Sequence, residues 1–154
     1  LETLNLSSNI TAISVGSHFG YSNPSLKSFT LPPCPNVSTI YYYFLNNCSS
    51  LETLDLSNLT YNGCTINMSQ GSQQPKFLAG CTKLKEVTLP NYSSTIPTLS
   101  VTWSDDIGSD SSVTEFKVIC ATSDQKTAYS SANKWKDITS IIAGQSKTIT
   151  WLPE

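Results

Sequence analysis

The sequence predicts an α/β fold in which the chain coils into a solenoid built around a short parallel sheet of about five strands. Two observations support this prediction. The segment LETLNLSSN at residues 1–9 returns almost unchanged as LETLDLSNL at residues 51–59, and its apolar frame, L-x-x-L-x-L, occurs five times. Self-similarity at a regular spacing indicates a repeat architecture, because each unit can bury its apolar face only against its neighbours.

The five frames define five repeats. They are Leu1-Leu4-Leu6, Leu26-Phe29-Leu31, Leu51-Leu54-Leu56, Leu84-Val87-Leu89 and Val113-Phe116-Val118. Their starts lie 25, 25, 33 and 29 residues apart, which brackets the period of leucine-rich repeats. The second and third apolar residues of each frame lie two apart, so both point to one face of a strand. Residues 1–119 are therefore predicted to form a leucine-rich repeat solenoid with a mostly irregular outer coil.

The half of each repeat that follows the strand carries a second pattern. LPPCPNVSTIYYYFLNNCSSL, at residues 31–51, contains Pro32 and Cys48, and FLAGCTKL, at residues 77–84, repeats its end with Cys81. With these motifs the sequence resembles the BspA-like (treponemal-type) bacterial surface leucine-rich repeat proteins. The fifth repeat departs from the pattern, because it lacks the proline and has Asp110 at the cysteine position. The resemblance implies adhesion to host or matrix proteins, or to other cells.

A helical C-terminal cap is predicted for residues 120–143. Its apolar residues recur at three- and four-residue steps, as on one face of a helix: Ala128, Ala132, Trp135, Ile138 and Ile142. Thr122 or Ser123 is suited to cap the start of this helix, and Gly144 is suited to its end. A cap is expected because the open end of a solenoid exposes apolar core.

The two ends of the chain differ in whether the sequence predicts a cap. Residues 144–154 alternate like a short strand, with Ile149 and Trp151 on one side, and form either a terminal strand or a linker. The first frame has no comparable cap, so we expect further repeats upstream of Leu1.

Two stretched repeats carry extra residues. In residues 59–75, Asn62-Gly63 is a strong signal for a β-hairpin, and the segment forms either a tolerated surface insertion or a binding protrusion. The other stretch contains Asp105, Asp106 and Asp110. Their spacing misses the frame of a calcium-binding loop, so a solvated acidic turn is expected.

Composition excludes several classes of partner. The net charge is −2 with only 9 Lys+Arg, so neither nucleic acid nor an anionic membrane surface is expected to bind. No apolar run approaches the roughly 20 residues of a membrane-spanning helix. Weak charge and abundant Ser and Thr favour a location at the cell surface or outside the cell.

The sequence contains no motif for catalysis. His18 is the single histidine, and the five cysteines show no C-x-x-C spacing, so we expect no cofactor and no metal site. Cys48 and Cys81 are expected to be buried thiols, with a disulfide between them as the alternative. Seven N-x-S/T sequons are present, at Asn5, Asn9, Asn36, Asn47, Asn58, Asn67 and Asn91. They arise either from glycosylation or from the composition of the repeat turns.

Two surfaces are candidates for binding. The first is the exposed face of the predicted sheet, which has small hydrogen-bonding side chains and no aromatic anchor. Its residues are Thr3, Asn5, Ser7, Ser28, Thr30, Thr53, Asp55, Glu86, Thr88, Glu115 and Lys117. The second is the aromatic run at residues 41–44, in which Phe44 fills a core position while Tyr41 and Tyr43 would grip a protein or a sugar ring.

These observations favour a non-catalytic binding module at the cell surface or in the secreted fraction, acting by adhesion to a protein or a cell-surface glycan. The alternative is a structural spacer that displays other domains and has no ligand of its own.

Overall fold

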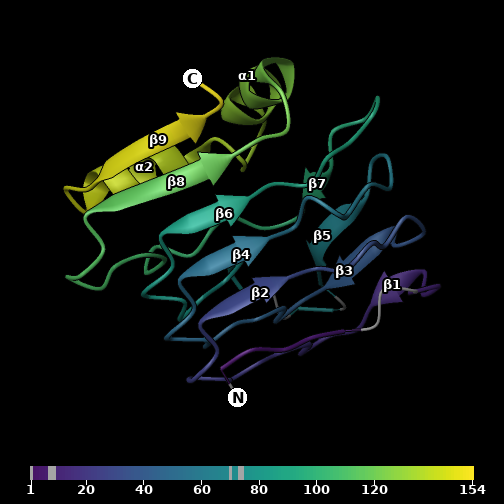
Figure 1. The fold of residues 1–154 in the computed structure, drawn as a ribbon, viewed down its shortest axis with the longest axis horizontal. Helices are drawn as coiled ribbons and strands as arrows, with labels where there is room; N and C mark the ends of the chain where they lie inside the picture. Colours follow the sequence, from purple (N-terminus) through teal and green to yellow (C-terminus); the bar gives the residue numbers. More distant parts are fainter. Residues whose placement is uncertain (1, 7–9, 70, 73–74) are drawn as a thin grey trace.

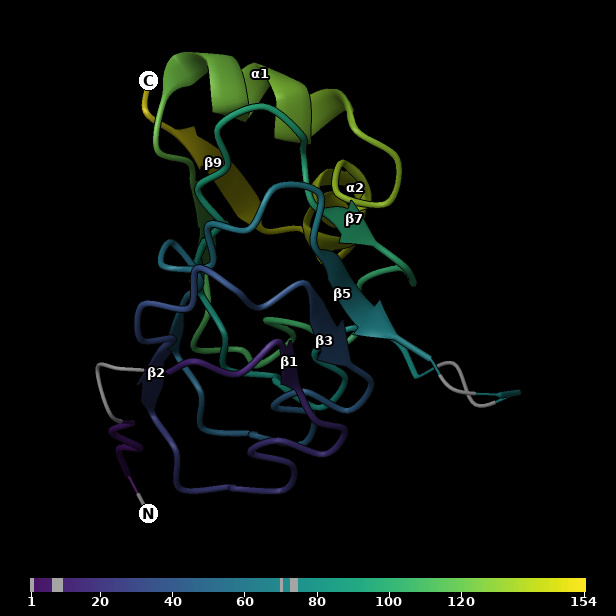
Figure 2. The same ribbon diagram turned by 90° about the vertical axis from the view of Figure 1, so that its right-hand side faces the viewer.

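The computed structural model describes residues 2–6, 10–69, 71–72 and 75–154 of the chain, and it is an α/β fold with two parallel sheets and two helices. The first sheet has the order β2-β4-β6-β8-β9, with strands Ser28–Thr30, Thr53–Asp55, Glu86–Thr88, Glu115–Ile119 and Thr148–Leu152. The second has the order β1-β3-β5-β7, with strands Ser14–Val15, Thr39–Tyr41, Thr65–Met68 and Thr98–Leu99. From β1 to β8 the chain alternates between the two sheets, which lie on opposite sides of the interior (Figures 1 and 2), and β9 returns to the sheet of β8.

The core lies between the sheets. The inward residues of successive strands stand opposite one another in register, and Phe29 faces Leu54, which in turn faces Val87. The first residue of each later frame is buried as well, with Leu26, Leu51 and Leu84 at most 1% exposed. This apolar ladder follows from the spacing of two between Leu54 and Leu56 and its equivalents, because alternate strand residues share a face.

The first repeat is less buried than the others. Thr3 forms a parallel bridge with Ser28, so the first frame lies beside β2 as expected. Leu4 and Leu6 are only half-buried, although both pack against the core. Leu1 lies outside the described residues.

The fifth repeat is shifted by two residues from the predicted alignment. Val87 pairs with Val118 and not with Phe116, and the strand extends over five residues. Phe116 and Val118 still point inward and are fully buried. A shift of two preserves which face each side chain occupies, so the apolar pattern alone does not distinguish the two registers.

The predicted irregular outer coil is in part a second sheet, and the predicted hairpin is wrong. β5 pairs in parallel with β3 and β7, from neighbouring repeats, and not with residues 59–61. Gly63, with φ +67°, does form a turn there, and its N–H donates to the carbonyl of Thr95. The long-range pairing between repeats therefore overrides the local hairpin signal.

The C-terminal end is covered by two helices, α1 at Ser123–Ser131 and α2 at Asp137–Gly144, where one continuous apolar face was predicted. Thr122 caps α1 by accepting a hydrogen bond of 3.1 Å from the N–H of Gln125, which satisfies one of the free donors of the first turn. Both helices contact β9, and Trp135, Ile138 and Ile142 are at most 1% exposed. Within the described residues, no helix combines the length and apolar character needed to cross a membrane.

Candidate functional site

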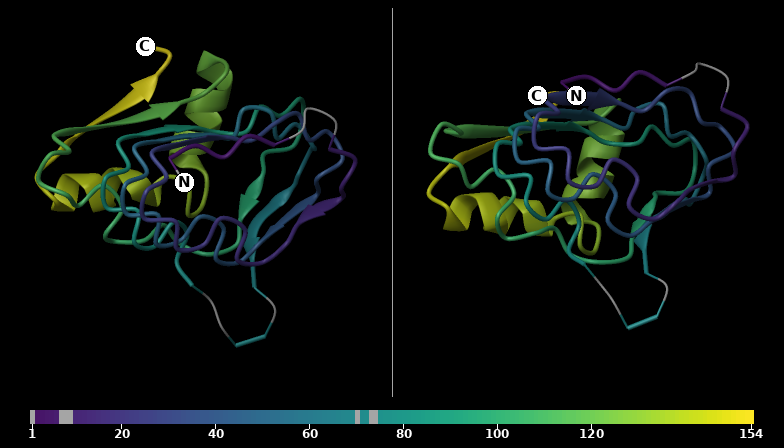
Figure 3. Two further views of the ribbon diagram at one scale, coloured as in Figure 1. Left: turned by 60° about the horizontal axis from the view of Figure 1, so that its bottom comes forward. Right: turned by 90° about the horizontal axis from the view of Figure 1, so that it is seen from below.

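The outer face of the sheet β2-β4-β6-β8-β9 carries no helix of the described chain, since α1 and α2 lie at its inner side and its C-terminal end (Figures 2 and 3). Strand register aligns its outward side chains into two rows. The first row contains Thr3, Ser28, Thr53, Glu86, Lys117 and Thr150. The second contains Thr30, Asp55, Thr88, Ile119 and Leu152. We call these two rows the sheet face.

The structure brings the predicted sheet-face residues together. The two that lie outside the rows are Asn5 and Glu115, and Glu115 pairs with Thr148 at the C-terminal end. Asn5 lines an open depression of about 440 Å³ together with Thr3, Ser28 and Thr30. Ser7, also assigned to this face, lies outside the described residues.

Charge on the sheet face is concentrated towards its C-terminal half. A second open depression, of about 210 Å³, is lined by Lys85, Glu86, Val113, Glu115 and Lys117. At the sheet margin Lys85 donates to the carboxylate of Glu52 at 2.5 Å, and this bond and the lysine charge lower the pKa of Glu52. Both carboxylates and ammonium groups are therefore available to a partner over a short distance.

The sheet face is preorganised by local hydrogen bonds. The Asp55 carboxylate accepts the N–H of Ser57 at 2.9 Å, and the Thr150 hydroxyl donates to the Glu115 carboxylate at 2.9 Å. These bonds hold side chains that would otherwise lose rotamer freedom on binding, which lowers the entropic cost of forming a complex.

The predicted aromatic run is divided by the structure. Phe44 is buried against Phe19, with ring centroids 5.7 Å apart, as its core assignment requires. Tyr43 stacks on His18 at 4.6 Å, and Tyr42 meets both of these rings edge-on. Tyr41 lies in β3 and is half-buried there.

Sequence reasoning missed His18 and Tyr21 as members of this aromatic group. Tyr21 lies edge-on to His18 at 5.4 Å and edge-on to Tyr43 at the same separation. The sequence does contain a signal for the contact between His18 and Tyr43, because these residues are 25 positions apart, which is the spacing of the first two repeats. Equivalent positions of adjacent repeats stack on each other.

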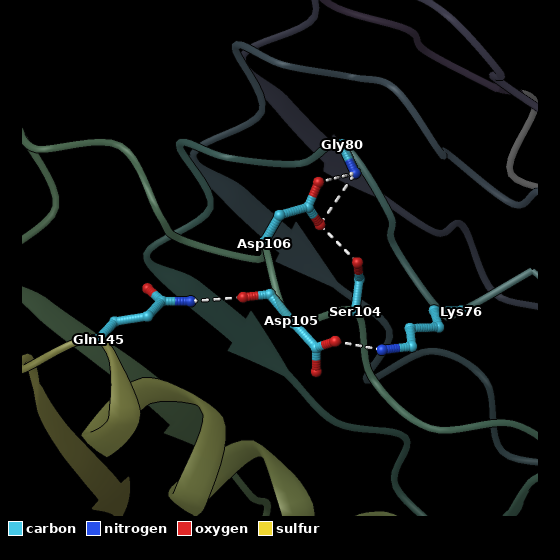
Figure 4. A network of polar contacts seen from close by, with 6 residues as sticks. All are labelled: Lys76, Gly80, Ser104, Asp105, Asp106 and Gln145. Atoms are coloured by element: carbon cyan, nitrogen blue, oxygen red, sulfur yellow. Dashed lines mark hydrogen bonds and ion pairs between the residues drawn. The ribbon is translucent and has the colours of Figure 1, made fainter.

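The acidic segment at residues 105–110 forms hydrogen bonds and an ion pair with other parts of the chain (Figure 4). Asp106 accepts the N–H of Gly80 at 3.0 and 3.2 Å and the Ser104 hydroxyl at 2.5 Å. Asp105 forms an ion pair with Lys76, and its carbonyl accepts the Gln145 side chain at 2.9 Å. Asp106 thus fixes the Gly80 turn of the neighbouring repeat, and Gln145 connects the cap to the same segment.

The third carboxylate, Asp110, accepts both the N–H and the hydroxyl of Ser112, as in a solvated turn. No group of three or more His, Cys, Asp or Glu side chains suited to holding a metal ion occurs among the residues that the structure describes.

All five cysteines are buried free thiols. Cys48 and Cys81 donate to the carbonyls of Gly20 and Leu45, which lie in the preceding repeats. Burial raises the pKa of every one of these thiols, to about 12 for Cys64 and about 11 for Cys120. At neutral pH the thiols are therefore protonated, a form that is a poor nucleophile and a poor metal ligand.

The structure separates the sequons by accessibility. Asn67 is fully buried and donates to the carbonyl of Pro75 at 2.7 Å, so it is closed to a glycosyltransferase. Asn5, Asn36, Asn47 and Asn91 are exposed, and Asn58 is half-buried. Asn9 lies outside the described residues.

Comparison with known proteins adds no relative: no family model matches the chain, and no curated protein or solved structure is significantly similar to it.

Proposed function

We propose that this chain is a leucine-rich repeat solenoid of the BspA-like type that binds a protein partner through the sheet face, at the cell surface or after secretion. The observation that carries the proposal is the register of the sheet face, which places side chains from successive repeats in two rows, with hydrogen-bonding groups throughout the first row and from Thr30 to Thr88 in the second. A rigid parallel sheet holds these groups at fixed spacing, so they can engage an extended partner surface together.

The composition of the sheet face favours weak, multivalent contact. It carries hydroxyls, carboxylates, one lysine and, at the end of the second row, Ile119 and Leu152, and neither row has an aromatic or arginine side chain of the kind that dominates tight interfaces. Linked copies of a weak site gain affinity because the second contact is intramolecular. Adhesion through many copies on one cell therefore suits this surface.

The role is proposed to be non-catalytic. The sheet face offers hydrogen bonding and charge, and the buried thiols are held protonated. His18 packs among tyrosines at the other side of the repeat, after β1. Recognition and adhesion require only the hydrogen-bonding groups that the rows supply.

The test is binding of clustered protein, displayed on beads, to a panel of immobilised extracellular matrix and host-surface proteins. The variant combines Thr53→Ala, Asp55→Asn and Glu86→Gln, which changes both rows and retains an acceptor for Ser57 at position 55. A matched control combines Thr127→Ala and Asp124→Asn on α1 with Asp137→Asn on α2, three positions on the helices and not on the sheet face. We expect at least a tenfold loss of bead retention in the first variant and no change in the control.

Two outcomes would contradict the proposal. Unchanged retention of the sheet-face variant would exclude these rows as the binding site. Failure of the clustered wild-type protein to bind any protein on the panel would favour the alternative, in which the chain is a structural spacer without a ligand of its own.

A further inference from the structure

A second surface of the molecule gathers four partly exposed aromatic rings. We define the aromatic patch as His18 and Tyr21 from the first repeat and Tyr42 and Tyr43 from the second. His18 stacks on Tyr43 with an interplanar angle of 26°, whereas Tyr21 and Tyr42 meet this pair edge-on. Tyr21 is 38% exposed, and His18 is exposed as well.

The backbone holds the aromatic patch in place. His18 and Tyr43 both have positive φ, at 62° and 61°, a conformation that is uncommon for residues other than glycine. The His18 N–H donates to the carbonyl of Tyr42 at 3.0 Å, which joins the backbones of the two repeats within the patch. These turns fix the positions of the rings before any ligand arrives.

Polar groups border the rings. The Asn47 side-chain amide donates to the Tyr21 hydroxyl oxygen at 3.1 Å. Because the Tyr21 oxygen accepts this bond, its own proton remains available to donate to a ligand. Asn47 is exposed, and its side-chain oxygen lies against the backbone of Gly80, which holds the amide group towards Tyr21.

The sequence around the aromatic patch is free of formal charge. Residues 3–26, 28–51 and 56–75 contain no Asp, Glu, Lys or Arg. Of the 20 such residues in the chain, only Glu2, Lys27, Glu52 and Asp55 precede residue 76. An anionic ligand such as a phosphate or a sulfated sugar would therefore find no lysine or arginine on these segments to pair with.

From these observations we infer that the aromatic patch binds a neutral glycan. The C–H groups on one face of a sugar ring are apolar and weakly positive, so they pack against the negative face of a tyrosine ring. The sugar hydroxyls would exchange hydrogen bonds with Tyr21 and Asn47. Four partly exposed rings offer at most a few hundred Å², which suits one or two sugar units, whereas a stable protein interface needs about 800 Å² per partner.

This inference does not depend on the sheet face, and its test has separate variants. Saturation-transfer NMR would be measured with neutral oligosaccharides of glucose, mannose, galactose and N-acetylglucosamine, and with heparin as an anionic probe. We expect transfer to at least one neutral sugar, and none to heparin. Tyr21→Ala should weaken binding at least tenfold, while Tyr21→Phe, which retains the ring and loses the hydroxyl, should weaken it about two- to fivefold.

Tyr61→Ala provides the matched control, because Tyr61 is 42% exposed and lies before β5, in the third repeat. It should leave sugar binding unchanged, as should the triple sheet-face variant. Thermal unfolding would verify that each variant is folded. Binding of no neutral sugar, preference for heparin, or full affinity in folded Tyr21→Ala would each overturn the inference, and retention of a protein partner lost in Tyr21→Ala would assign the patch to protein binding instead.

Discussion

The two ends of the repeat stack are closed to different degrees. At the C-terminal end Trp103, Tyr129 and Trp135 are at most 1% exposed, and each donates a hydrogen bond to a backbone carbonyl. At the N-terminal end Leu6, Val15 and Phe19 are only half-buried. These three residues line an apolar depression of about 250 Å³, which also reaches Leu31 and Cys34.

The difference shows what a cap must supply. A repeat at the end of the stack has no neighbour to cover its apolar residues or to accept its backbone hydrogen bonds. Trp135 and Tyr129 serve both needs, because each has a large apolar ring and one polar atom. Trp135 donates to the carbonyl of Pro97 at 2.7 Å, and Tyr129 to that of Pro90 at 2.9 Å. The first repeat has apolar side chains of similar kind but lacks a comparable layer over them within the described residues.

The largest expected effect comes from removing the central ring of the cap. Trp135→Ala should lower the free energy of unfolding by about 3–5 kcal/mol, the range for truncation of a fully buried aromatic residue. Phe19→Ala, at the half-buried end, should cost about 1–2 kcal/mol because less apolar area is lost. Urea unfolding monitored by far-ultraviolet circular dichroism measures both values. Equal losses in the two variants would show that the N-terminal end is as tightly closed as the cap.

A pair of glycines gives the next comparison. Gly108 has φ +65°, and a Cβ there would lie 2.8 Å from the Leu84 carbonyl oxygen and 3.2 Å from the Phe116 ring. Gly108→Ala should therefore cost about 1–3 kcal/mol, from backbone strain and from this close approach. Gly16, at the other end, has no atom within 4 Å of such a Cβ and no positive φ.

Gly16→Ala serves as the control for this experiment. It should be neutral or stabilising by up to about 1 kcal/mol, because it restricts the unfolded chain. Denaturant midpoints measured in parallel would check both changes. A destabilised Gly16→Ala variant would indicate that the first repeat packs more closely than the structure describes.

Sequence alone predicted the apolar ladder well and the second sheet poorly. Phe29, Leu54 and Val87 stand in register because each belongs to a frame with two inward residues, a pattern that a short strand requires. β3 and β7 each bury a single apolar residue, Ile40 and Leu99, so no alternation marks them as strands. Their pairing depends on neighbouring repeats, which a local pattern does not record.

The two proposed binding surfaces also differ in how far the sequence predicts them. The sheet face could be predicted because strand alternation determines which side chains point outward. The aromatic patch could be predicted only in part, because Tyr42 and Tyr43 are adjacent in sequence while Tyr21 approaches Tyr43 through the stacking of two repeats. The rings are presented by positive-φ turns at His18 and Tyr43, a backbone conformation that an apolar pattern does not indicate.

A further comparison concerns two buried thiols near opposite ends. Cys34 is 0% exposed and lines the N-terminal apolar depression, whereas Cys120 is 4% exposed and follows β8. Static exposure would favour reaction at Cys120. Because labelling of buried groups proceeds through local opening, we expect iodoacetamide to modify Cys34 first at pH 8, with the order read by peptide mass spectrometry. Faster labelling of Cys120 would show that the cap opens before the first repeat.

The pH dependence of stability at alkaline pH tests how closely the C-terminal end packs around Cys120. Burial raises the pKa of Cys120 from 9.0 to about 11, so between these values the unfolded chain releases a proton that the folded chain retains. Stability from this group is therefore complete below pH 9 and declines as pH rises towards 11, by roughly 1 kcal/mol per pH unit at most. Cys120→Ala should flatten the fall in the unfolding free energy between pH 9 and pH 10.5. An identical slope in the variant would mean that Cys120 is as well solvated in the folded protein as in the unfolded chain, and that the cap is looser than its buried tryptophans indicate.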